Sequence, residues 1–144
     1  MAIIVPSEYG YVLATSAVSA LQIFGMGIAV GAARKKAQVP YPYVYAEKSE
    51  AEKDIRKHIF NCTQRVHQNT LEMFPIFNTL LLIGGIKHPE LSAGAGVVYL
   101  LGRFIYSKGY TTGKPEKRAY GAIGYFGLIT LLYTSGSTIY HLLK

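Results

Sequence analysis

A stretch without charged residues, from Tyr9 to Ala33, most constrains what this chain can fold into. It exceeds the roughly 20 residues that a helix needs to cross the hydrocarbon core of a bilayer. A cleaved signal peptide is the alternative, but the first eight residues include Glu8 and no Lys or Arg, so the basic start of such a peptide is missing. The stretch therefore predicts a membrane-spanning helix over about residues 9–35.

Three further apolar segments predict three more spanning helices, over about residues 59–86, 91–111 and 117–142. The uncharged part of the first of these, Met73 to Ile86, is too short to cross by itself, so the helix must include polar residues before it. Pro75 lies inside this helix and predicts a kink or one loosened turn. Small residues at 93–96 predict close helix packing in the next segment.

The charge pattern distinguishes a membrane protein from a soluble or nucleic-acid-binding one. The formal net charge is +7, but the basic residues fall in two clusters between apolar segments, as in cytoplasmic loops, and do not form a face with interleaved aromatic residues. A soluble four-helix bundle is the alternative, yet the first and last helices carry no charged stripe for solvent. We expect one all-α domain over residues 1–144, with four up-and-down transmembrane helices and the N-terminus outside.

Polar residues on the second and third helices predict a functional site within this apolar frame. Arg65, Asn69 and Glu72 are spaced four and three residues apart and share one helix face. Arg103, Tyr106 and Tyr110 make a matching set on the third helix, followed by Lys117 and Arg118. Because ionisable side chains at membrane depth are costly, they normally pair or bind a ligand in the bundle interior. A structural ion pair between Arg65 and Glu72 is the alternative.

The chemistry of this set suits a small peptide-like anion. Arginine and lysine suit carboxylates, Glu72 suits an ammonium group, and the amide and phenol groups suit peptide bonds. Glutathione has these groups and also a thiol, whose pKa of about 8.5 is lowered by a nearby cation. No metal site is expected, because a single histidine, His67, lies near this set without a carboxylate at ligand spacing. The one cysteine, Cys62, cannot form an internal disulfide, and it does not indicate a cysteine-based metal site.

The segment "FNCTQRVHQNTLEMFPIF", residues 60–77, closely resembles the second-helix signature of the MAPEG family, the membrane-associated proteins in eicosanoid and glutathione metabolism. The similarity continues in residues 7–13, 33–36 and 102–118, and so covers nearly the whole chain. It implies a homotrimer of four-helix subunits, with glutathione bound between neighbouring protomers near the cytoplasmic face.

The resemblance also implies roles for individual residues. Positions that match glutathione contacts are Arg34, Arg65, Asn69, Glu72, Tyr106 and Tyr110. His67 aligns with a glutamine of the leukotriene C4 synthases, so its role is less defined, and Arg103 belongs to the set through its shared face with the tyrosines. Where those synthases have a thiolate-stabilising arginine this chain has Lys117, with Arg118 adjacent, and Met73 replaces a tyrosine after the motif glutamate.

The function implied is a membrane-bound glutathione transferase that conjugates glutathione to lipophilic electrophiles and reduces lipid hydroperoxides. The expected partners are glutathione as co-substrate, a lipophilic electrophile or hydroperoxide, membrane lipids and two further copies of the chain, but not nucleic acid. The expected location is the endoplasmic reticulum or the outer mitochondrial membrane. The alternative is a noncatalytic member that binds glutathione or lipid as an accessory subunit of a larger membrane complex.

Overall fold

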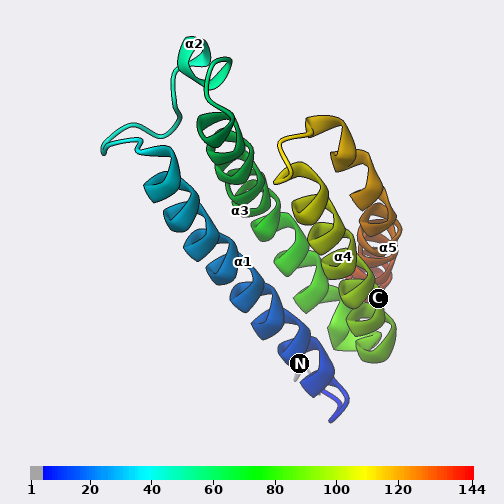
Figure 1. Ribbon diagram of the computed structural model, residues 1–144. Coiled ribbons are helices and arrows are strands. Elements are labelled where there is room, and N and C mark those ends of the chain that lie inside the picture. The colour runs from blue at the N-terminus through cyan, green and yellow to red at the C-terminus, as the bar shows by residue number, and fades with distance from the viewer. Residues whose placement is uncertain (1–4) are drawn as a thin grey trace.

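The structure, a computed structural model, describes residues 5–144, in which every regular element is helical (Figure 1). The elements are α1 (Tyr9–Ala37), α2 (Lys48–Ala51), α3 (Ile55–Lys87), α4 (Pro89–Tyr110), the 3₁₀ helix η1 (Pro115–Ile123) and α5 (Gly124–Leu142). The four long helices run up and down beside one another. Their arrangement matches the all-α bundle expected from the apolar segments.

Local sequence signals explain where the helices begin and end. The last turn of the first helix carries three basic residues, whose positive charges interact favourably with the negative end of the helix dipole. After them, Gln38 adopts a left-handed conformation (φ 53°), and its backbone N–H points to the carbonyl oxygens of Arg34 and Lys35. The side chain of Asp54 caps α3 by accepting a hydrogen bond from the backbone N–H of Arg56. Pro89 starts α4, where the missing N–H costs nothing.

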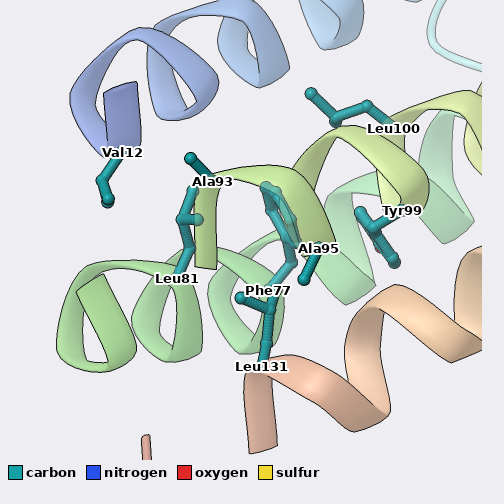
Figure 2. Packing of buried hydrophobic residues seen from close by; sticks show 8 residues of the cluster. All are labelled: Val12, Phe77, Leu81, Ala93, Ala95, Tyr99, Leu100 and Leu131. Carbon is teal, nitrogen blue, oxygen red and sulfur yellow. The ribbon is translucent and has the colours of Figure 1, made fainter. Parts of the chain in front are cut away.

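The hydrophobic core lies where all four long helices meet (Figure 2). The rings of Phe77 on α3 and Tyr99 on α4 stack with their centroids 4.3 Å apart. Val12 of α1 and Leu131 of α5 are fully buried in the same cluster. One cluster thus joins the first helix to the last.

Within residues 5–144, three stretches are long and apolar enough to cross a membrane: Tyr9–Ala37, Ile55–Lys87 and Pro115–Leu142. The fourth long helix, α4, has 22 residues. The outer face of α1 exposes Leu21, Phe24 and Ile28, each more than 60% accessible. Water disfavours such a continuous apolar face, which suits lipid or another subunit.

The helix boundaries lie within two residues of those expected, apart from the start of the second long helix and the 3₁₀ form of the start of the last. The second long helix starts at Ile55 instead of residue 59, because the Asp54 cap allows one more turn of charged residues, and it continues through Pro75 as an α-helix. The last helix begins as η1, which packs closely on α4: a Cβ at Gly102 would lie 2.9 Å from the carbonyl oxygen of Gly121 in η1 and 2.5 Å from Cα of Gly124, where α5 starts. These contacts require glycine and set the position of η1 beside α4.

Candidate functional site

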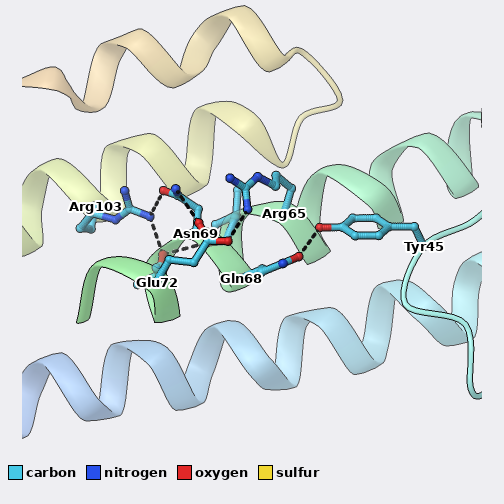
Figure 3. A network of polar contacts seen from close by, with 8 residues as sticks. Tyr45, Arg65, Gln68, Asn69, Glu72 and Arg103 are labelled. Carbon is cyan, nitrogen blue, oxygen red and sulfur yellow. Dashed lines mark hydrogen bonds and ion pairs between the residues drawn. The ribbon is translucent and has the colours of Figure 1, made fainter. Parts of the chain in front are cut away.

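The polar face of α3 is organised around Glu72 (Figure 3). Nη1 of Arg65 donates to Oε1 of Glu72 at 2.9 Å, and Nδ2 of Asn69 donates to Oε2 at 3.4 Å. Spacings of four and three residues bring these side chains together over two helical turns. The face predicted from the sequence is therefore present, and its single carboxylate is shared by a cation and an amide.

Arg103 connects α4 to this face of α3 (Figure 3). Its Nη2 donates to Oδ1 of Asn69 at 3.0 Å and to Oγ1 of the buried Thr70 at 2.6 Å. Its guanidinium also lies over the ring of Tyr106, 4.2 Å from the centroid. The Nε of Arg103 is buried and finds no acceptor among residues 5–144.

A cavity of about 390 Å³ lies between this face, α4 and η1. Its polar lining includes Arg65, Asn69, Arg103, Tyr106, Tyr110 and Arg118. The rings of Tyr106 and Tyr110 lie 5.6 Å apart, and Gly121 leaves room for the first of them, since a Cβ there would lie 2.5 Å from Cβ of Tyr106. Three arginines against one neighbouring carboxylate give the pocket a net positive charge, which favours a small anion.

The sequence profile of the MAPEG family matches residues 12–137. The chain belongs to the MAPEG family. A curated relative, human microsomal glutathione S-transferase 2, is 32% identical over 127 residues, which are 85% of this chain and 79% of that protein. Membership of this family, together with the three helical stretches that are long and apolar enough to cross a membrane, indicates that the chain is an integral membrane protein.

Three residues that the MAPEG resemblance implies as glutathione contacts do not line the pocket of this single chain: Arg34, His67 and Glu72. Glu72 still contacts two lining residues, Arg65 and Asn69. Nη1 of Arg34 donates to the backbone oxygens of Tyr43 at 2.7 Å and Val39 at 3.4 Å, so this cation is bound by the loop after α1. His67 lies against α1, where a Cβ at Gly27 would be 3.6 Å from its Nε2.

The two candidate thiolate-stabilising cations lie differently in this MAPEG chain. Arg118 lines the pocket, whereas Lys117 does not. The backbone of Lys117 packs against α4, because a Cβ at Gly109 would lie 2.7 Å from its carbonyl oxygen. Adjacent residues on the tight 3₁₀ helix point in different directions: Lys117 is half-buried, whereas Arg118 is exposed and borders the pocket.

Sequence reasoning missed two tyrosines at the site. Tyr125 of α5 lines the pocket. Tyr45, in the loop between α1 and α2, donates its phenol proton to Oε1 of Gln68 at 2.5 Å beside Arg65 (Figure 3). Burial, the largest cause, raises the pKa of Tyr45 above its ordinary value of 10.0, so the phenol stays protonated and remains a donor. Tyr125 was missed because it lies on an apolar helix, where no polar residue at helical spacing indicates a site. Tyr45 was missed because it lies in a loop, where helical periodicity gives no information.

Proposed function

We propose that this chain is a membrane-bound glutathione transferase that conjugates glutathione to lipophilic electrophiles and reduces lipid hydroperoxides. One observation carries the proposal: the polar face of α3 and the Arg103–Tyr110 face of α4 enclose a single cationic pocket within a frame of apolar helices. The similarity to a human microsomal glutathione S-transferase supports it. Within the family, the sequence of the second-helix motif, residues 60–77, most resembles that of microsomal glutathione S-transferase 3.

Glutathione would enter from the end of the bundle that carries the basic loops. Its carboxylates would form ion pairs with Arg65 and Arg103. Its ammonium group would form an ion pair with the carboxylate of Glu72, which accepts hydrogen bonds from Arg65 and Asn69 in the structure. Tyr106 and Tyr110 would donate to peptide oxygens. Such a cradle fixes the orientation of a flexible tripeptide before the chemical step.

The cation of Arg118 would stabilise the glutathione thiolate, since it lines the pocket and Lys117 does not. With an epoxide, the sulfur forms a bond to carbon, the carbon–oxygen bond breaks and the alkoxide takes a proton. With a hydroperoxide, two glutathione molecules become the disulfide, while the hydroperoxide becomes an alcohol and water. Positioning and charge stabilisation are sufficient for both reactions.

We propose further that the protein is a homotrimer of four-span subunits, located in the endoplasmic reticulum or the outer mitochondrial membrane. The positions of Arg34 and His67 support an assembly of several protomers, because both lie away from the pocket of their own chain. In an interface between protomers they would complete the pocket of a neighbour. The exposed apolar face of α1 is also suited to such a contact.

The test is to purify the full chain in detergent and to measure glutathione binding together with turnover of a chromogenic electrophile and of a lipid hydroperoxide. Binding with turnover of either substrate supports the transferase. Binding without turnover supports the second candidate, a noncatalytic glutathione-binding subunit, which the same polar pocket would also serve. Absence of glutathione binding contradicts both.

A further inference from the structure

A second cavity, of about 410 Å³, lies where α1, α3 and α4 approach the basic loops. None of its lining residues lines the cationic pocket of Arg65, Arg103 and Arg118, which from here on is called the glutathione pocket. From α3 the second cavity uses Arg56, Ile59 and Thr63, and from α4 it uses Ser107, Lys108 and Thr111. The two cavities therefore use different faces of α3 and α4. We call the second one the α1–α3–α4 groove.

Three cations stand at one level of this groove. Lys36 lies in the last turn of α1, Arg56 in the first turn of α3 and Lys108 in the last turn of α4. All three are exposed. In a membrane bundle, helix ends lie at the level of the lipid headgroups, where basic side chains attract anionic lipids. The cations are thus placed at phosphate depth.

The charge on these cations is largely available. Among residues 5–144, no ion pair involves Lys36 or Lys108. Arg56 donates through Nε and Nη2 to Asp54, at 3.1 and 2.8 Å. A guanidinium has five donors, so three of them are left for another acceptor. The cluster keeps an excess of positive charge.

The wall below the cations is apolar and built from small residues. Ala29, Ala32 and Ala33 of α1 line it, opposite Ile59 of α3. Ala29 and Ala32 are exposed, and each lies a turn or more deeper than Lys36 along the helix. Because these side chains are methyl groups, they leave open space beside α1, within a cavity of about 410 Å³. The groove therefore combines an anion-binding rim with an apolar channel, as an amphiphile requires.

We propose that the α1–α3–α4 groove is a binding site for an anionic phospholipid. The phosphate lies among Lys36, Arg56 and Lys108, and one acyl chain follows Ala29 and Ala32 along α1. A free phosphate ion would use the cations but leave the apolar channel uncovered. The lipid thereby ties the ends of three helices together without entering the glutathione pocket.

The test is native mass spectrometry of the full chain in detergent, titrated with phosphatidylglycerol or with phosphatidylcholine of the same acyl chains. Wild type is expected to retain phosphatidylglycerol in preference to phosphatidylcholine. Lys36→Gln/Lys108→Gln is expected to bind phosphatidylglycerol roughly tenfold more weakly, because two headgroup contacts are lost. Lys35→Gln/Lys114→Gln, with the same change of charge outside the groove, should bind like wild type.

A second variant keeps the test independent of the lysines. Ala32→Phe fills the channel from an exposed position while all three cations remain, and it too is expected to weaken phosphatidylglycerol binding. Equal losses in the two lysine pairs would overturn the proposal, as would equal retention of both lipids. Displacement of the lipid by millimolar inorganic phosphate in wild type would show a simple anion site and would overturn it as well.

Discussion

Arg65 and Glu72 lie two turns apart on α3 and form a hydrogen-bonded ion pair, with Nη1 2.9 Å from Oε1. The side chains are 41% and 48% exposed, so the pair contributes little to folding. Arg65 also lines the cationic pocket. Under the proposed function, the pair consists of two binding groups that satisfy each other until a ligand with a carboxylate and an ammonium group replaces both contacts.

Replacing Arg65 with alanine separates these two interpretations. Arg65→Ala is expected to weaken glutathione binding by roughly 10- to 100-fold, because a charge-assisted contact to a carboxylate is lost. The melting temperature should change little. Titration calorimetry and a thermal scan in the same detergent measure the two effects. Arg65→Lys, which keeps the charge but not the planar fork, should fall between wild type and alanine. A large fall in melting temperature with unchanged affinity would make the pair structural.

Thr70 supports the pocket from within the core. Its Oγ1 accepts from Nη2 of Arg103 at 2.6 Å and donates to the carbonyl oxygen of Val66 at 2.8 Å. Thr70→Val keeps the volume but removes the acceptor, so we expect a loss of about 1–2 kcal/mol in unfolding free energy and weaker glutathione binding. Thr63→Val is the matched control, since within residues 5–144 the hydroxyl of Thr63 bonds only to the carbonyl of Ile59 in its own helix. Equal effects of the two substitutions would contradict this role.

The close approach of η1 and α5 to α4 depends on Gly102. A Cβ there would lie 2.5 Å from both Cα and N of Gly124, which are backbone atoms that cannot rotate away. Gly102→Ala is expected to cost about 1–3 kcal/mol through overpacking and to reduce turnover by moving Arg118. Gly94→Ala on the same helix meets nothing within 4 Å and should be neutral or slightly stabilising. Denaturant unfolding of the two variants compares them directly.

Asp54 predicts a pH dependence at the start of α3. Its hydrogen bonds to Arg56 hold the pKa of this carboxyl below its ordinary value of 3.8. A lowered folded-state pKa means that the contribution to stability is present above the unfolded value and is lost as the pH falls through the folded one. Asp54→Asn keeps a capping oxygen without the charge, so it should flatten the dependence of melting temperature on pH below about 4. An identical profile in wild type and variant would exclude this contribution.

Much of the fold could be predicted from sequence because its signals are local. Charge-free stretches mark the long helices, and spacings of three and four residues place Arg65, Asn69 and Glu72 on one face. Burying the charge of Arg103 at membrane depth costs free energy unless the side chain is hydrogen-bonded, so a contact between Arg103 of α4 and the polar face of α3 is expected. These predictions need only chain length, periodicity and desolvation.

The remaining parts depend on contacts between distant segments. Tyr45 reaches Gln68 from an irregular loop, and Tyr125 reaches the pocket from an otherwise apolar helix. Helix η1 brings Arg118 to the pocket but not Lys117, and glycines allow its backbone to touch α4. Neither periodicity nor composition carries this information. The resemblance to the family placed Arg34 and His67 at the site, but in one chain they lie elsewhere, where a neighbouring protomer could use them.

The most direct measurement of the central claim is the rate of glutathione conjugation by purified wild type, Arg118→Ala and Lys114→Ala at saturating electrophile. Lys114 is exposed and lies outside the pocket. We expect wild type and Lys114→Ala to turn over alike, and Arg118→Ala to be slower by roughly 100-fold, as for loss of one charge-stabilising group. Equal rates in all three proteins, or no turnover by wild type that binds glutathione, would contradict the account of this pocket as the site of thiolate chemistry.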